Sequence, residues 1–168
     1  MDAATFDAFY SGSFSRVVGQ VYAMCGDFAE AQDCVQEAFV RAWDHRRQLD
    51  RTRQPEAWVR TVAWRLAVSR WRRARRALAP PDRSRLPAPP SEPDIHHTAI
   101  VAALRQIPEE QRRAVVLYHL CDLSVADVAA ETGVAVGTVK ARLSRGRTAL
   151  AALLEDETAV RTEEEHHA

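Results

Sequence analysis

Between residues 138 and 147, long basic side chains alternate with small ones. No other segment of the sequence indicates its chemistry as clearly. The basic residues are Lys140, the only lysine among 23 Lys and Arg residues, and Arg142, Arg145 and Arg147. Such donors can reach phosphates and guanine edges, while the small Ala141 and Ser144 allow close approach to a groove of DNA. The pattern favours DNA binding. The alternative is an amphipathic helix with a solvated basic face.

A second basic stretch runs from Arg60 to Arg76 and contains seven arginines and no acid, with Trp64 and Trp71 among them. Arginines interleaved with tryptophans suit a single nucleic-acid strand, because cations contact its backbone and rings stack on its bases. For Trp64 the sequence leaves a core position and a surface contact equally open. The helical spacing of Trp58 from other apolar residues predicts that Trp58 is buried.

The first 40 residues have the opposite charge, with six acids and one base, Arg16. Asp33 and Glu37 are four residues apart and therefore share one face of a helix, where they can pair with arginines of a partner protein. A solvated helix face is the alternative. The net charge of +0 thus results from acidic and basic segments that cancel, which suggests separate surfaces for separate partners.

The sequence contains no P-loop, nucleophile elbow or HExxH motif. His119 and Cys121 form the nearest metal-like pattern, but no second pair stands at ligand spacing. Cys25, Cys34 and Cys121 lack CxxC spacing, so we predict that they are small buried apolar residues. We therefore expect no enzymatic activity, no metal and no cofactor.

Two further observations bear on location. No apolar run approaches the ~18–20 residues of a membrane span. The N-terminal MDAATFDAFY has neither the basic nor the apolar region of a signal peptide. We expect a cytoplasmic protein that does not bind membranes.

The elements that position these residues are predicted to be helices. Six of the eight prolines fall between Pro80 and Pro93, and proline fixes φ and removes a hydrogen-bond donor, so this segment is a semi-extended linker. No strand-like alternation occurs, which predicts an all-α protein with two small helical domains. The predicted parts are a first domain 1–76, a linker 77–94, a second domain 95–154 and an acidic tail 155–168.

In the first domain, Asp27 is a candidate N-cap, and the helix after it has a regular apolar stripe. That stripe consists of Ala31, Val35, Ala38, Phe39 and Ala42. Pro55 fits the first turn of a third helix. Two apolar stripes are predicted there: Trp58, Val62 and Leu66, and Trp64, Val68 and Trp71.

In the second domain, residues 123–150 have the layout of a helix-turn-helix. Ser124 is the predicted N-cap, supported by Asp127 three residues later, and Gly133 supplies the turn. Val139 and Leu143 are four residues apart and would anchor the inner face of the second helix, which leaves the basic residues of 138–147 mostly outward.

Three segments resemble one family in the same order. The segment GDFAEAQDCVQEAFVRAW (26–43) resembles the core-polymerase-binding helix of extracytoplasmic-function (group IV) bacterial sigma factors. QPEAWVRTVAWRLAVSRWRR (54–73) resembles their promoter-melting helix. Residues 104–150, which include the Gly-Thr-Val-Lys-x-Arg signature, resemble their C-terminal domain. Three motifs around a linker are far more specific than any one of them.

The resemblance implies a sigma factor that binds promoter DNA and core RNA polymerase, the latter through the β′ clamp helices and the β flap. An anti-sigma factor is a further partner that the resemblance implies. The residues implied in polymerase binding are Asp33, Gln36 and Glu37. Those implied at the minus-10 element are Arg60, Trp64, Arg65, Trp71 and Arg72, with the loop 45–54. Those implied at the minus-35 element are Thr138, Lys140, Ala141, Arg142, Ser144 and Arg145, with Arg112 as a phosphate contact.

The sequence departs from the family pattern where many members carry Arg, Asn and Asp. The residues here are Thr61, Arg65 and Ser69, and an arginine in place of Asn keeps hydrogen-bond donors but loses the acceptor. The alternative function is a stand-alone helix-turn-helix regulator that binds duplex DNA without polymerase. It accounts for residues 123–150 but gives the acidic and Arg/Trp helices no role.

Overall fold

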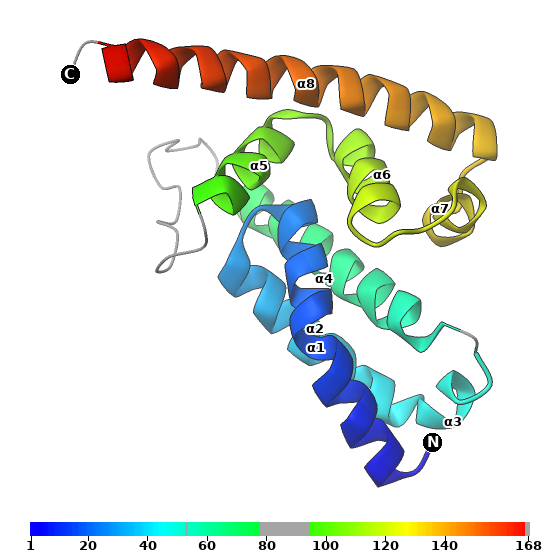
Figure 1. Ribbon diagram of the computed structural model, residues 1–168. Coiled ribbons are helices and arrows are strands. Elements are labelled where there is room, and N and C mark those ends of the chain that lie inside the picture. The colour runs from blue at the N-terminus through cyan, green and yellow to red at the C-terminus, as the bar shows by residue number, and fades with distance from the viewer. Residues whose placement is uncertain (53, 78–94, 167–168) are drawn as a thin grey trace. The chain divides into compact units, whose positions relative to one another are not determined.

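The computed structural model describes residues 1–52, 54–77 and 95–166, with side chains described up to Glu155 except at a few positions beside the gaps. All regular structure in these residues is helical, which confirms the predicted fold class. The chain separates into two compact units, Met1–Ser91 and Glu92–Ala168, and both are seen in Figure 1. Most of the predicted linker, residues 78–94, lies outside the described residues.

The first unit consists of three long helices and one short one: α1 (Ala3–Cys25), α2 (Phe28–Asp44), α3 (Arg46–Leu49) and α4 (Pro55–Ala77). The helices α1, α2 and α4 pack pairwise against one another. Helix α1 begins at an N-cap, Asp2, and runs unbroken through Gly12. It ends at Gly26, whose φ of 79° is a left-handed conformation that glycine adopts without steric cost.

The predictions for α2 are confirmed. The Asp27 side chain accepts a hydrogen bond from the Glu30 amide at 2.9 Å, as an N-cap does. The whole predicted apolar stripe of α2 is buried. Within the contact between α1 and α2, Phe39 packs against an aromatic cluster of α1 that consists of Phe6, Phe9, Tyr10 and Phe14.

Two predictions for the following segment need correction. The stretch expected as a loop, 45–54, contains the short helix α3. Helix α4 begins at Pro55 as predicted, but of the residues in the two predicted stripes only Trp64 is buried, so the buried side differs from both stripes. The buried side comprises Val59, Arg60, Ala63, Trp64 and Ala67, because α4 packs on both α1 and α2 and buries a broader face than one stripe. Trp58 is only half-buried and stacks on His45, with ring centroids 5.5 Å apart.

The second unit contains α5 (Ile95–Gln106), α6 (Glu109–His119), α7 (Val125–Thr132) and α8 (Val136–His166). Helices α7 and α8 form the predicted helix-turn-helix. Ser124 accepts a hydrogen bond from the Asp127 amide at 3.1 Å and donates its hydroxyl to the Asp127 carboxylate at 2.6 Å. Gly133 ends α7 with a φ of 71°, so the predicted turn is confirmed.

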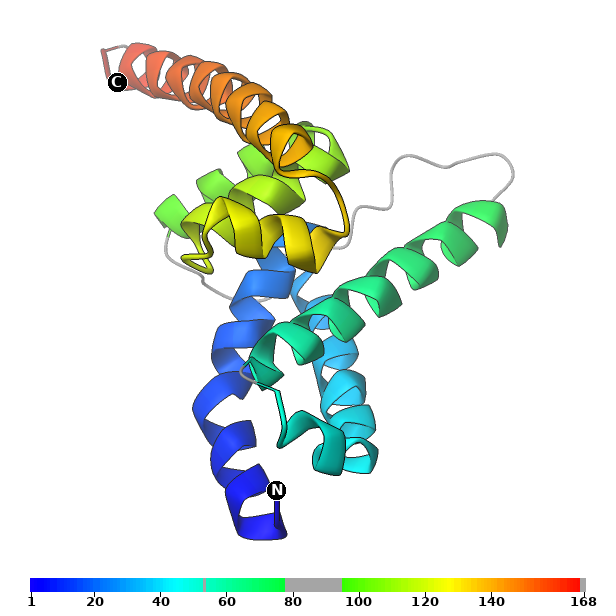
Figure 2. The ribbon, with the colours of Figure 1, turned by 90° about the vertical axis from the view of Figure 1, so that its right-hand side faces the viewer.

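Helix α8 is much longer than a recognition helix requires, and its backbone continues through the segment expected as an acidic tail, to His166 (Figure 2). Near its middle it packs closely on α6 at Gly146. A Cβ at that position would lie 2.8 Å from Cγ2 of Val115. The glycine therefore permits a helix contact that any larger residue would push apart.

None of the helices in the described part of the chain has the length and apolarity needed to cross a membrane.

Candidate polymerase and promoter interfaces

One face of α2 is exposed opposite its buried stripe. Asp33 and Gln36 lie on it, and Val40, one turn further, is 62% exposed. Cys34, Val35 and Ala38 between them are fully buried, which fixes the rotation of the helix and keeps this face outward. An acid, an amide and an apolar side chain on one rigid stripe can bind a partner that offers basic and apolar groups.

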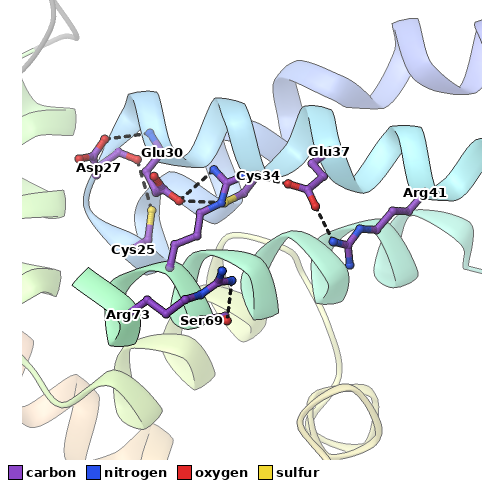
Figure 3. A network of polar contacts seen from close by, with 9 residues as sticks. Cys25, Asp27, Glu30, Cys34, Glu37, Arg41, Ser69 and Arg73 are labelled. Atoms are coloured by element: carbon purple, nitrogen blue, oxygen red, sulfur yellow. Dashed lines mark hydrogen bonds and ion pairs between the residues drawn. The ribbon is translucent and has the colours of Figure 1, made fainter. Parts of the chain in front are cut away.

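Glu37 differs from Asp33 although both are acids on the same helix. Its carboxylate forms ion pairs with Arg41 of α2 and, at 2.7 Å, with Arg70 of α4. Figure 3 shows the pair of Glu37 and Arg41. Hydrogen bonds from Arg41, and then from Arg70, lower the pKa of Glu37, although partial burial opposes them. In the free protein, Glu37 is therefore already paired within its own domain.

Two residues predicted to contact the minus-10 element are in the core instead. Arg60 is 3% exposed and donates a hydrogen bond to the Gln20 side-chain oxygen at 3.0 Å. Trp64 is 6% exposed and packs on the buried side of α4. Their burial gives the predicted minus-10 contacts of Arg60 and Trp64 no support, and both contacts stay untested predictions.

Arg65, Trp71 and Arg72 are exposed on α4, and Trp71 is 52% exposed. Of the positions that depart from the family pattern, Thr61 is half-buried, and Ser69 is exposed and accepts a hydrogen bond from Arg73 at 3.2 Å. The exposed side of α4 thus carries cations beside an accessible ring, the combination that binds unpaired nucleic-acid bases.

The start of α8 has the predicted division of faces. Val139 and Leu143 are 0% and 1% exposed. The exposed positions among the candidates are Thr138, Lys140, Ser144 and Arg145, and Ala141 is half-buried. A helix with an anchored inner face and a small-and-cationic outer face can enter a major groove.

Two other candidate arginines have partners within the second unit. The Arg142 guanidinium pairs with Glu110 of α6 at 2.6 Å, and only 19% of its side chain is exposed. Arg112 is half-buried and donates a hydrogen bond to the Leu104 carbonyl oxygen at 3.4 Å. Both arginines belong to the second unit, and their contacts with phosphates stay predictions.

Of the three cysteines, only Cys34 is fully buried, whereas Cys25 and Cys121 are half-buried. The prediction of three buried cysteines is thus right for one of them. Within the described residues, no group of three or more His, Cys, Asp or Glu side chains could hold a metal ion.

Comparisons with known proteins agree with this division into two units. Residues 10–77 match the family described as sigma-70 region 2, and residues 97–150 match the family described as sigma-70, region 4. Region 2 corresponds to α1–α4 and region 4 to the helix-turn-helix unit, which defines the class of the protein as a two-region sigma factor.

Individual relatives narrow the class. The chain is 32% identical over 163 residues to the ECF RNA polymerase sigma factor SigL of Mycobacterium tuberculosis, a match that covers 92% of both chains. It is 29% identical over 157 residues to SigW of Bacillus subtilis, covering 80% of this chain and 81% of that one. The fold matches the sigma factor RpoE of Bartonella quintana, solved with the anti-sigma factor NepR, with a TM-score of 0.76 and 25% identity over 90% of this chain and 97% of that one.

The chain therefore belongs to the extracytoplasmic-function (ECF) family of RNA polymerase sigma factors. It directs promoter-specific transcription initiation through regions 2 and 4, and the family is not enzymatic. The stand-alone regulator does not account for the region 2 match.

Two residues of these surfaces were missed by reasoning from sequence. Val40 is an exposed apolar residue beside Asp33 and Gln36, and the alternation of buried and exposed positions along α2 could have identified it. Arg70 was counted among the basic residues of the 60–76 stretch, and nothing in its spacing indicates that it pairs with α2.

Proposed function

We propose that the two units divide the work of promoter recognition, with the exposed face of α2 binding the β′ clamp helices of core RNA polymerase. Asp33, Gln36 and Val40 would form this contact. This assignment is supported by the exposure of all three residues on one face of α2, while the opposite face of the helix is buried. Glu37 borders the face, but its pairing with Arg41 and Arg70 makes it a weaker candidate. The second unit would contact the β flap.

The exposed side of α4 would contact the minus-10 element after its bases leave the stack. Arg65 and Arg72 supply cations for the strand backbone, and Trp71 supplies a ring on which a base can stack. The segment 45–54 leads directly into α4 and would take part in reading the exposed bases. Arg60 and Trp64 hold the helix in place from within the core.

The first turns of α8 would read the minus-35 element from the major groove. The residues assigned to base edges are Thr138, Lys140, Ala141, Ser144 and Arg145, and those assigned to phosphates are Arg142 and Arg112. The observation that carries this assignment is the complete burial of Val139 and Leu143, since it directs Lys140, Ser144 and Arg145 outward.

An anti-sigma factor is a further proposed partner. Its support is the fold shared with the Bartonella quintana sigma factor, which was solved with the anti-sigma factor NepR. We also propose that the protein acts in the cytoplasm, where core polymerase and promoter DNA are found.

The test is transcription from a genomic promoter library with purified core RNA polymerase, comparing the wild-type chain with Asp33→Arg. The wild type should start transcription at defined sites and bind promoter DNA poorly without core. Asp33→Arg should weaken core binding at least ~10-fold, because it places a cation opposite basic groups of the partner. Core affinity is measured by fluorescence anisotropy.

Thr5→Arg is the control for this charge change, since it adds a cation to an exposed site at the start of α1. It should bind core as the wild type does. Unchanged core affinity in Asp33→Arg would remove the docking assignment, and strong promoter binding without core would favour the stand-alone regulator.

A further inference from the structure

One arginine of α4 pairs with two acids of α2. Nη1 of Arg70 lies 3.3 Å from Oε1 of Glu30, and Nη2 lies 2.7 Å from Oε2 of Glu37. The two acids are seven residues apart, which is about two helical turns, so they lie on one side of α2. Because separate nitrogens contact separate turns, the pairs fix both the distance and the register between the helices. We call Arg70, Glu30 and Glu37 the clamp; this name refers to side chains of this protein and not to the β′ clamp helices of core polymerase.

Cys34 lies between the two acids along α2 (Figure 3). Cys34 is fully buried, and its thiol donates a hydrogen bond to Oε1 of Glu30 at 3.2 Å. Burial, and then the hydrogen bond to Glu30, raise the pKa of Cys34 to about 12, so the thiol is neutral at physiological pH. Glu30 and Glu37 are therefore the anions that Arg70 meets on this side of α2.

The clamp lies where the apolar packing of α4 ends. Ala67 is the last fully buried side chain of α4 among those described, and Trp71 and Arg72, directly after Arg70, are exposed. Beyond Ala67, where no further described side chain of α4 is buried, Arg70 joins the helix to α2 through ion pairs. The exposed residues proposed to meet the minus-10 strand are attached to the domain at this point.

We propose that Arg70 is a positioning residue for promoter opening, which fixes the last turns of α4 on Glu30 and Glu37 and thereby orients Trp71 and Arg72. This inference rests on the proposed role of α4 at the minus-10 element. Arg70 acts through its neighbours and does not itself contact the DNA.

The rival role for Arg70 is a direct contact with a phosphate, and Glu37→Gln separates the two. If Arg70 bound phosphate, removing the Glu37 charge would free its guanidinium and remove a nearby anion, so promoter opening would become faster. If the clamp positions α4, the same substitution removes one of its two anchors, so opening becomes slower. The two roles predict opposite signs.

The experiment uses holoenzyme reconstituted from core polymerase and the full chain, on a promoter identified by transcription mapping. Promoter opening is followed by permanganate reactivity of unpaired thymines in the minus-10 element. We expect Glu37→Gln, which removes one pair, to open about tenfold more slowly, the scale of losing one charge-assisted hydrogen bond. Arg70→Gln removes both pairs and should open at least as slowly. The double variant should be no slower than Arg70→Gln alone, because Arg70→Gln already removes the pair with Glu37.

Three further variants make the test specific. Arg70→Lys should recover part of the rate, since one ammonium cannot contact both acids as the guanidinium does. Arg73→Gln is the matched control, because Arg73 is one turn along on α4 and bonds Ser69 instead of an acid. Glu30→Gln removes only the 3.3 Å pair and replaces Arg70→Gln should that variant not fold. Core affinity should be that of the wild type in Arg70→Gln and Arg73→Gln, and the salt dependence of DNA binding should be that of the wild type in Arg70→Gln and Glu37→Gln.

Three outcomes would each contradict the positioning role of Arg70. They are faster opening in Glu37→Gln, additive effects of the two single variants, and equal losses in Arg70→Gln and Arg73→Gln. Trp71→Ala distinguishes failure of the clamp from failure of the proposed function. Slow opening in Trp71→Ala with normal opening in Arg70→Gln overturns the clamp alone. The reverse pattern overturns the role of Trp71 and leaves the clamp supported.

Discussion

Side chains of one type have quite different surroundings in this protein. Asp33 and Glu37 are four residues apart on α2, yet Asp33 is exposed and Glu37 pairs with two arginines. The same holds on α4, where Arg60 is buried against Gln20 and Arg65 is exposed. A charge on a helix can bind a partner only where the domain has not already neutralised or buried it.

At the residue scale, Arg145→Ala tests the reading of the minus-35 element. Arg145 is exposed on the outer face of α8, so its loss should reduce discrimination at one base step by ~1–3 kcal/mol. The measurement is holoenzyme affinity for a set of promoters that carry single base changes. An equal loss on every sequence would make Arg145 a phosphate contact instead.

Arg147→Ala is the control for that substitution. The Arg147 side chain donates to the Leu143 carbonyl oxygen at 3.3 Å and lies 6.0 Å from the Tyr118 ring centroid, so it already has partners in its own domain. Its removal should leave the base preference unchanged.

Helix α4 is held at each end by polar pairs and between them by apolar packing. Near its start, Glu56 pairs with Arg16 of α1, with Nε of the arginine 3.0 Å from Oε1 of the acid. Near its end, the clamp joins it to α2. The helix proposed to contact the minus-10 element therefore depends on ionised carboxylates for its placement.

The pair at the start of α4 predicts a pH dependence of stability. The hydrogen bond from Arg16 lowers the pKa of Glu56 below its ordinary value, 4.5, although burial opposes it. A lowered pKa means that the pair stabilises the fold above the unfolded value and that this is lost as pH falls through the folded value. The stability difference between wild type and Glu56→Gln should thus shrink below pH ~4.5.

All four tryptophans lie within residues 43–71, so urea unfolding followed by tryptophan fluorescence reports on the first unit. Arg16→Gln removes the same pair from α1 and should give the same pH profile. A difference that is constant from pH 7 to pH ~3 would contradict the role of this pair.

In the second unit, Gly146→Ala tests the contact between α6 and α8. The new Cβ would lie 2.8 Å from Cγ2 of Val115 and 3.4 Å from the Gln111 carbonyl oxygen. Overpacking costs about 1–3 kcal/mol, and the helix propensity of Ala returns about 1 kcal/mol. We expect a net destabilisation of about 1 kcal/mol, seen as faster hydrogen exchange in α6 and α8.

Gly137→Ala is the control on the same helix, since no atom lies within 4 Å of its added Cβ. It should leave exchange in α6 unchanged. Slower exchange in both variants would show that the crowding at Gly146 is relieved without cost.

At the scale of the whole molecule, the chain consists of two units with separate cores. The proposed minus-10 residues belong to the first and the proposed minus-35 residues to the second. Trp71 and Arg145 therefore belong to different units, which leads to a prediction about their combination.

We expect Trp71→Ala and Arg145→Ala to be additive in free energy. Sites without shared contacts usually add within ~0.5 kcal/mol, so the rate of initiation in the double variant should equal the product of the two single fold-changes. Abortive transcription from one promoter provides the rates. A marked departure from the product would show that the units act on each other during initiation.

The sequence alone determined the helical class, the order of the segments and the family. Local patterns specify features that depend on neighbours a few residues away. These are the periodic apolar residues of α2, the caps at Asp27 and Ser124, and the turn at Gly133. The outward face of α8 follows in the same way, since the burial of Val139 and Leu143 fixes the positions between them.

Only the tertiary structure decided which charged and aromatic residues of the first unit are available to a partner. Arg60 and Trp64 are buried because α4 packs on α1 and α2 together, and residues forty and thirty-three positions apart in sequence meet in the pairs of Arg60 with Gln20 and Arg70 with Glu37. Spacing along one helix defines the faces of that helix. Which face is covered depends on helices that arrive from elsewhere in the chain, and a local pattern contains no information about them.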